Sequence, residues 1–371
     1  MRSVPFLLAL TAASIPTNMN ASDPRPSLIL ENARARLVTD LGGGSIASFT
    51  LTDSDLNPLN WDSWSLGPTP ELPPTPDPRG MGHFLCLDRW GPATPAEEAH
   101  GMGPHGEASV VWWHVDPPPA GEADRTTARL SATLPMAGLR VDRDVALIGD
   151  QSCFVVTETI INTRPLGRVY NCVQHPSIAA PFLGPSTIVD CNGTRGFMQA
   201  TPLPNPEDPE VRWPAALSPS GTEVDMRHLD PSAVPWVVSY IIEEPVGWIT
   251  AANPDKGLLL GYLWSTKDYP WVSHWAHLEN GKILYRGLEF GTTGLHQPEP
   301  ALVEKGRIFD RRLIRYIDAD ESQAFRYAGF LLEIPADYAG TGILVFEDGV
   351  VRIEERGGRN RILTLKIGRI F

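Results

Sequence analysis

Hydrophobic and polar residues alternate along most of the chain in short runs, which is the period of a β-strand with one buried face. Turns rich in glycine and proline separate these runs, and no helical pattern of about 10 to 15 residues lies between them. This rhythm favours an antiparallel sandwich over a series of βαβ units. We therefore predict strands at 108–115, 127–133, 139–147, 153–162, 237–242, 247–252, 258–265, 283–290, 313–319 and 324–333.

Glycine turns mark hairpins near both ends of the chain. Alternating runs at 33–41 and 45–51 flank a triple glycine, and 349–354 is expected to pair with 361–367 across Gly357 and Gly358. Proline-dense loops at 68–79 and 201–221 cannot be central strands. Because neither an internal repeat nor a composition break divides the sequence, we predict one all-β domain over residues 28–371.

Residues 1–27 form a predicted N-terminal extension. An apolar run at 4–10 after Met1 and Arg2 is typical of a short signal peptide, although Met19 could equally be the true start. We favour the cytoplasm, with the periplasm or secretion as the alternative if the segment is a genuine signal. No other segment approaches the roughly 18 apolar residues that span a bilayer, so we expect no membrane association.

The composition narrows the class of partner. A formal charge of −13 over 371 residues disfavours nucleic acid and anionic membranes, because both need basic patches. Neutral ligands fit better. The four cysteines, at 86, 153, 172 and 191, are scattered, which indicates isolated buried thiols rather than a zinc site or a disulfide framework.

Several familiar cofactor-binding and catalytic motifs do not occur. The sequence has neither a phosphate-binding P-loop nor a zinc-binding H-E-x-x-H, and G-x-S-x-G is missing too. His274 and His277 are three residues apart, which on a strand points them to opposite faces. We therefore expect no cofactor and no metal, and leave the oligomeric state open.

Glu289 is the first candidate for chemistry. It lies in an apolar strand-like run between Gly287 and Gly291, where burial would raise its pKa toward the value that a general acid or base needs. The alternative is an acid on the wet face of a strand, because Leu288 and Phe290 alternate with it.

Two histidines join Glu289 as candidates. His105 lies among glycines at 101, 103 and 106, where a ligand could approach the backbone closely. His175 precedes Pro176, which holds its backbone extended at a predicted strand end. Each alone could be an ordinary hydrogen-bonded histidine, but with Glu289 they form a plausible acid–base set.

Tryptophans gather just ahead of Glu289. Trp264, Trp271 and Trp275 could stack on the C–H face of a sugar, or could be ordinary core residues. The neighbouring Lys267, His274 and His277 favour a binding groove, because ligand sites are mostly apolar with a few converging polar groups.

Four segments, in this order, resemble the aldose 1-epimerase (galactose mutarotase-like) superfamily over residues 28–369. They are LGGGSIASF at 41–49, PHG at 104–106, QHP at 174–176 and LEFG at 288–291. The resemblance implies a large antiparallel β-supersandwich with a concave sugar-binding face. It also implies that His105 binds the sugar, His175 is the general acid and Glu289 is the general base.

The family's substrate-binding arginine and acidic sugar ligand match this sequence less well. Arg89, Asp268 and Lys267 are the candidates for these roles. The leading hypothesis is a cofactor-independent isomerase that interconverts sugar anomers and takes a small sugar or an oligosaccharide end. The alternatives are a non-catalytic carbohydrate-binding or sugar-sensing protein of the same fold, and a relative of polysaccharide lyases or glycoside hydrolases.

Overall fold

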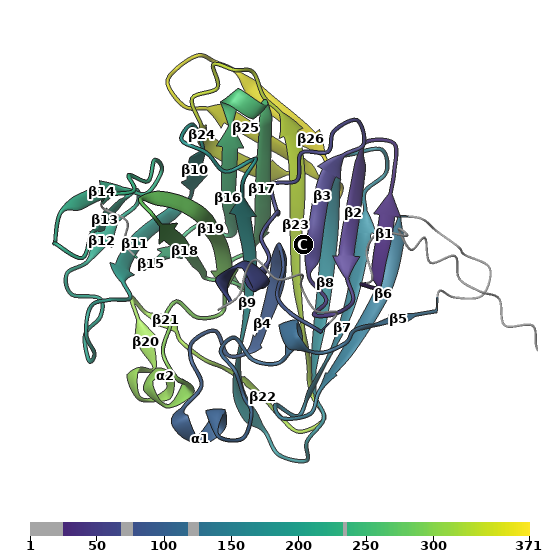
Figure 1. Cartoon of the computed structure of the whole chain (residues 1–371), viewed down its shortest axis with the longest axis vertical. Coiled ribbons are helices and arrows are strands. Elements are labelled where there is room, and N and C mark those ends of the chain that lie inside the picture. The colour runs from purple at the N-terminus through teal and green to yellow at the C-terminus, as the bar shows by residue number, and fades with distance from the viewer. Residues whose placement is uncertain (1–24, 68–76, 118–125, 233–235) are drawn as a thin grey trace, which may run out of the picture.

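Two large antiparallel β-sheets pack against each other in the computed structural model, which describes residues 25–67, 77–117, 126–232 and 236–371 (Figure 1). The predicted all-β sandwich is confirmed. The N-terminal extension, apart from its last three residues, and most of the proline-dense 68–79 loop lie outside the described residues.

The first sheet has eleven strands among the described residues, and the candidate site lies on it. Its path is β1-β2-β3-β4-β9-β19-β18-β15-β11-β12, with β22 paired to β9. The bounds are β1 Ser27–Glu31, β2 Ala35–Asp40, β3 Ile46–Leu51, β4 His83–Asp88, β9 Arg168–Ala179, β11 Gly193–Met198, β12 Val211–Arg212, β15 Val237–Ile242, β18 Trp271–Glu279, β19 Lys282–Gly291 and β22 Arg315–Ile317.

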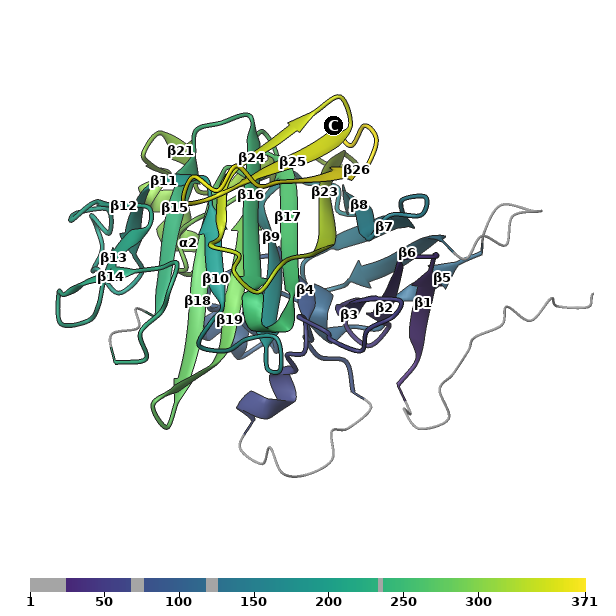
Figure 2. The same cartoon turned by 90° about the horizontal axis from the view of Figure 1, so that it is seen from above.

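The second sheet has eight strands in the described chain, in the order β10-β16-β17-β23-β8-β7-β6-β5. It packs face to face with the first sheet across a shared apolar core (Figure 2). The bounds are β5 His114–Asp116, β6 Thr127–Leu134, β7 Leu139–Leu147, β8 Cys153–Asn162, β10 Ile188–Cys191, β16 Val246–Asn253, β17 Leu258–Ser265 and β23 Ser322–Glu333.

Smaller elements complete the described chain. The meander β24-β25-β26 covers the outer face of the second sheet, and two short hairpins stand apart from the large sheets. The bounds are β13 Ala215–Leu217, β14 Glu223–Asp225, β20 Arg307–Ile308, β21 Arg311–Arg312, β24 Thr341–Glu347, β25 Val350–Glu355, β26 Ile362–Lys366, α1 Pro95–Glu98, α2 Glu299–Lys305, and 3-10 turns at Ser63–Leu66, Ala108–Val110 and Pro254–Lys256.

Strand β17 shows how alternation builds three layers. Leu260 and Tyr262 point into the core between the two sheets, whereas Leu259 and Leu263 point into a second apolar cluster beneath the meander. Both faces of the strand are therefore buried. This explains why its sequence is continuously apolar rather than alternating.

Most predicted strands are present, with three corrections. Residues 108–115 are a 3-10 turn followed by β5, and 313–319 contains only the short β22. His175 lies inside β9 rather than at a strand end. The ladder between β9 and β19 is interrupted at Pro176, which has no N–H to donate, so a proline fits within this central strand.

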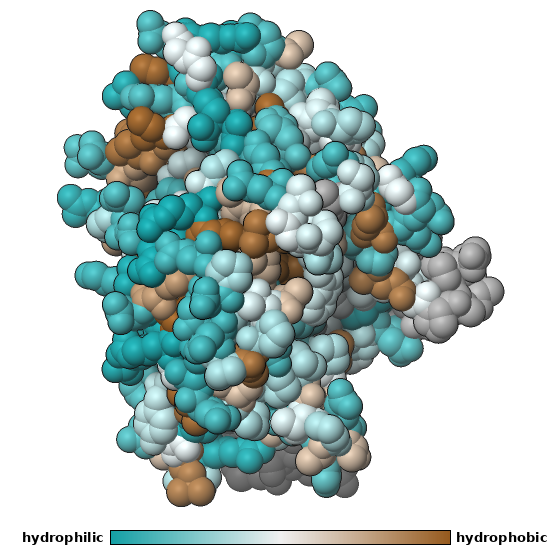
Figure 3. Space-filling view, turned by 90° about the vertical axis from the view of Figure 1, so that its left-hand side faces the viewer, coloured by the Kyte–Doolittle hydropathy of each residue, from teal (hydrophilic) through white to brown (hydrophobic). Residues whose placement is uncertain are grey.

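The outer face of the first sheet, away from the second sheet, carries an aromatic cluster. Trp61, Phe84 and Trp90 are buried there, and Trp275 and Tyr285 pack against them. Figure 3 shows the side of the molecule where β12 to β15 lie; its surface is mostly hydrophilic, and apolar residues are visible in a hollow near its middle. Within the described residues, no helix has the length and apolar character to cross a membrane.

Candidate active site

Glu289 is buried on the outer face of β19, with 1% of its surface exposed. Leu288 and Phe290, its neighbours in the strand, point the other way into the core between the sheets. The surface-acid interpretation is therefore wrong, because the aromatic cluster covers this face. Burial raises the pKa of Glu289 to about 8, and a hydrogen bond from Trp90 partly opposes that rise.

His175 projects from β9 toward Glu289. Its Nε2 is 3.4 Å from Oε1 of Glu289, and its Nδ1 is 3.0 Å from the hydroxyl of Ser177. Phe84 stacks on the imidazole with ring centroids 4.3 Å apart. Burial lowers the pKa of His175 well below its usual value, and the nearby His105 adds to this effect.

The raised pKa of Glu289 and the lowered pKa of His175 favour a neutral carboxyl beside a neutral imidazole near neutral pH. A neutral carboxyl beside a neutral imidazole carries the same number of protons as a carboxylate beside an imidazolium. The proton can therefore shift between Oε1 and Nε2 without exchange with solvent. Such a pair can offer a base on one residue and an acid on the other.

His105 lies in a tight turn that approaches the same site. Its backbone has φ +65°, and the following Gly106 has φ +75°. A Cβ on Gly106 would lie 1.9 Å from the carbonyl oxygen of Leu87, so the turn packs directly against the end of β4. Gly106 thus serves protein packing in this structure, and the turn brings the His105 ring to 5.7 Å from that of His175.

Trp90 links two of these residues. Its indole Nε1 donates a 2.5 Å hydrogen bond to Oε2 of Glu289. Its backbone also hydrogen-bonds His105, which partly offsets the burial that lowers the pKa of His105 to about 4. In the sequence, Trp90 is distinguished only as the residue after the candidate Arg89. No local pattern indicates that it bonds to Glu289.

His296 is a further histidine that sequence reasoning missed. Its ring lies 5.7 Å from that of His105 and 5.0 Å from that of Trp90. Burial lowers its pKa to about 3. His296 follows Glu289 by seven positions, just beyond the end of β19. This closeness in the sequence could have identified it as a candidate site residue.

Aromatic rings form the wall of the site on the side of β18. Trp275 lies 5.9 Å from His175 and 6.2 Å from Trp61, between ring centroids. Trp275 pairs across the sheet with Gly287, where a Cβ would lie 2.8 Å from Oε1 of Glu289. Glycine at 287 therefore leaves the space that the Glu289 carboxyl occupies.

The other two predicted tryptophans lie elsewhere. Trp264 is fully buried between the sheets and stacks on Phe290 with ring centroids 4.1 Å apart. Trp271 is on the Glu289 side of the sheet, but it is fully buried in a separate apolar cluster with Phe197 and Leu295. The structure brings only Trp275 to the acid–base group.

Lys267 and Asp268 lie in the β17–β18 turn, where their backbone carbonyls accept hydrogen bonds from Arg315. Arg89 forms ion pairs with Asp88 at 2.8 Å and with Glu97 at 2.7 Å. No hydrogen bond or ion pair in the described chain joins these three candidates to the acid–base group.

His274 and His277 lie on opposite faces of β18, as their spacing predicts. His274 stacks on Trp213 and has its Nε2 3.7 Å from the sulfur of Cys191. His277 lies on the other face, stacked on Tyr285.

A buried polar network supports β9 on the face that is turned toward the second sheet. Gln174 donates to Glu158 at 2.6 Å and lies 3.0 Å from Nε2 of His83. Glu158 in turn pairs with Arg143 at 2.7 Å, and both side chains are at most 3% exposed. Because Gln174 is fixed on the inner face, the next residue, His175, is held toward Glu289 on the outer face.

Solved structures share the fold of this chain, whereas no family model and no curated protein matches its sequence. Among solved structures, the Slr1438 protein from Synechocystis matches at 14% identity with a TM-score of 0.58, covering 84% of this chain and 97% of that one.

Two further matches carry descriptive names. A galactose mutarotase related enzyme from Lactobacillus acidophilus is 12% identical, with a TM-score of 0.58 over 83% of this chain and 98% of that one. A galactose mutarotase-like protein from Lactobacillus casei is 11% identical, with a TM-score of 0.58 over 82% and 100%. At these identities the likeness shows the fold alone.

The predicted fold is therefore confirmed: the chain has the antiparallel β-supersandwich fold of the galactose mutarotase-like structures that it matches. This agreement extends over most of the length of each matched structure.

Proposed function

We propose that this protein is a cofactor-independent sugar epimerase that interconverts the anomers of a small sugar or of an oligosaccharide end. The observation that carries the proposal is the 3.4 Å separation of Glu289 Oε1 and His175 Nε2 in a buried, aromatic-walled site. Two groups that share one proton suit a reaction that removes a proton at one oxygen and returns one at another.

The reaction follows from these roles. Glu289, as a carboxylate, takes the proton from the C1 hydroxyl while His175, as an imidazolium, protonates the ring oxygen. The C1–O5 bond breaks to give the open-chain aldehyde, and rotation about C1–C2 exposes the other carbonyl face. Ring closure then reverses both proton transfers, so atoms and charge balance. His105 would hydrogen-bond the sugar and polarise it.

A second candidate is a sugar-binding protein without catalysis. Trp90 already occupies Oε2 of Glu289, and the carboxyl is 1% exposed, so only Oε1 remains for a substrate. A binding protein needs the aromatic wall but not a titrating carboxyl. A glycosidase would also require a second carboxylate roughly 5 to 9.5 Å from Glu289.

Glu289→Gln separates the candidates, because it keeps the shape and removes the basic oxygen. An epimerase should lose roughly two to four orders of magnitude in turnover while still binding sugar. Anomer exchange is measured by NMR or polarimetry across neutral hexoses and pentoses, beside calorimetry on both proteins. A wild-type protein that binds sugar without accelerating exchange is a binding module, and a fully active Glu289→Gln variant contradicts the proposed role of Glu289.

A further inference from the structure

A cavity of about 570 Å³ opens beside the acid–base site and does not include any of its residues. Its wall comes from the end of β4, from α1 and the loop after it, from the β6–β7 turn, from the β8–β9 loop with the start of β9, and from the first residue of α2. Arg89 faces this cavity, whereas the next residue, Trp90, faces Glu289. The volume is within the usual range for small-molecule sites.

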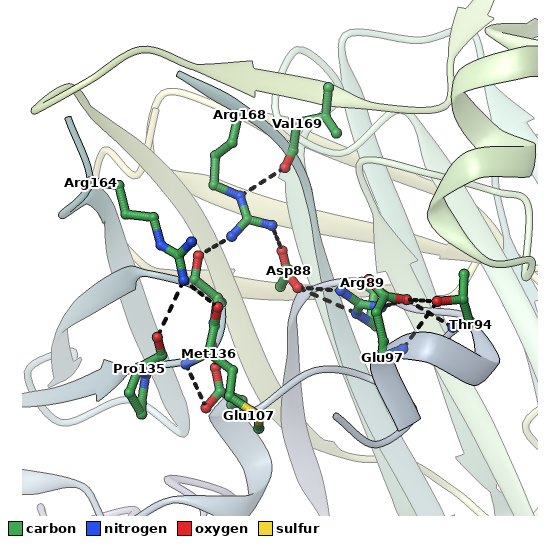
Figure 4. Close-up of polar contacts among 11 residues, drawn as sticks. Asp88, Arg89, Thr94, Glu97, Glu107, Pro135, Met136, Arg164, Arg168 and Val169 are labelled. Carbon is green, nitrogen blue, oxygen red and sulfur yellow. Dashed lines mark hydrogen bonds and ion pairs between the residues drawn. The ribbon is translucent and has the colours of Figure 1, made fainter. Parts of the chain in front are cut away.

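Two arginines of the wall are already neutralised (Figure 4). Arg168 pairs with the buried Asp88 and also donates to the carbonyl of Val169. Arg89 pairs with Asp88 and with Glu97. Because each charge has a partner of opposite sign, this group forms a fixed wall and leaves little net charge for a ligand.

The β6–β7 turn is also held in place. Glu107, which is 2% exposed, accepts hydrogen bonds from the backbone N–H groups of Met136 at 3.2 Å and Ala137 at 2.7 Å. The carbonyls of this turn therefore point to the arginines of the wall (Figure 4).

Arg164 and Glu299 differ from the paired residues. Arg164 donates from Nη2 to the carbonyl of Met136 at 2.6 Å, and no carboxylate pairs with it in the described chain. Oε2 of Glu299 is buried without a hydrogen-bond donor among the described residues. Within the described residues, the cavity thus presents one guanidinium without a carboxylate partner. It also presents the carboxyl of Glu299, whose pKa is raised by burial and whose Oε2 lacks a donor in the described chain, so the neutral form that an anion tolerates is favoured there.

We propose that this cavity is a second binding site, for a small hydroxylated anion such as a sugar acid or a sugar phosphate. The anionic group would pair with Arg164, which still has N–H groups to donate. A ligand hydroxyl would donate to Oε2 of Glu299, and the carbon frame would pack on Met102, Met136 and Leu166. With a protein charge of −13, attraction of an anion here must come from the local guanidinium.

The test is calorimetry on the full chain with gluconate, glucose 6-phosphate and inorganic phosphate. The first two should bind more tightly than inorganic phosphate, which has no hydroxyl-bearing carbon frame. Arg164→Gln should weaken their binding by about tenfold or more, since a charge-assisted hydrogen bond contributes on the order of 1.5 to 3 kcal/mol. Gluconate against glucose 6-phosphate distinguishes the carboxylate from the phosphate source.

Three further variants keep the result interpretable. Leu166, which is 75% exposed, can become Glu without loss of core packing, and the added charge should also weaken binding. Arg129→Gln removes an exposed arginine on β6 and should leave binding unchanged. Trp275→Ala removes part of the aromatic wall of the proposed sugar site and should leave the binding of both anions unchanged, which separates the two sites. The proposal is overturned if neither organic anion binds, if Arg164→Gln has no effect, or if Arg129→Gln or Trp275→Ala weakens binding equally.

Discussion

The indole Nε1 of Trp90 donates a 2.5 Å hydrogen bond to Oε2 of Glu289, across 199 positions of sequence. The bond joins the segment just after β4 to the first sheet and fixes one oxygen of Glu289, whose pKa is raised to about 8. Because the donor stabilises the charged carboxylate, Trp90 opposes the effect of burial.

Trp90→Phe should therefore raise the pKa of Glu289 further. A lost hydrogen bond to a charged group amounts to on the order of 1.5 kcal/mol, which corresponds to about one pH unit. Infrared titration of the carboxyl band, with Glu289→Gln to assign it, measures the shift. Trp61→Phe is the matched control, since Trp61 lies in the same cluster without a bond to Glu289. An unchanged or lower pKa in Trp90→Phe would refute this role.

The rate of anomer exchange should be constant while the Glu289–His175 pair holds one proton. It should fall as pH rises through about 8, because the pair then loses that proton and no acid remains for the ring oxygen. On the acid side the rate should persist below pH 6.5, because the pKa of His175 is lowered by burial. Initial rates corrected for spontaneous exchange give the profile, and a rate that climbs steadily from pH 7 to 9 would be inconsistent with a shared proton.

Gly287→Ala should impair catalysis more than stability. Its new Cβ would lie 2.8 Å from Oε1 of Glu289 and 3.2 Å from Cβ of Trp275, so the carboxyl must move. A displacement of about 1 Å in a reacting group can cost roughly 100-fold in rate. Gly184→Ala is the control, because the nearest atom to its Cβ would be 3.8 Å away. Equal turnover in the two variants would mean that the carboxyl position does not limit the reaction.

Arg143→Met should destabilise the fold by about 3 to 5 kcal/mol, because it leaves the Glu158 carboxylate buried without its cation. Arg143→Met combined with Glu158→Leu should recover much of that loss. The exposed pair of Arg129 and Asp144 on β6 and β7 is the comparison, and Arg129→Met should cost at most about 1 kcal/mol. Urea unfolding of the variants measures each free energy, and a single Arg143→Met as mild as Arg129→Met would contradict the structural role of the buried pair.

Local pattern predicted most of the strands, and it singled out three residues of the candidate site. Alternation of apolar and polar residues identifies most strands of both sheets, because every second residue of a strand lies on the same face. Glu289 stood out as a carboxylate between apolar neighbours, and the order of the segments around His105, His175 and Glu289 carried the resemblance to the fold that the structure confirms.

Only the tertiary structure decided which faces are covered, and by what. Trp264 and Trp275 look alike in the sequence, yet one packs between the sheets and the other beside His175, because alternation does not say which side of a strand meets the second sheet. Trp90 and His296 reach the site through strand pairing and loop packing between distant segments. The pKa of Glu289 depends on the same contacts, since burial by side chains from β4, β9 and β18 raises it, and no local pattern encodes that burial.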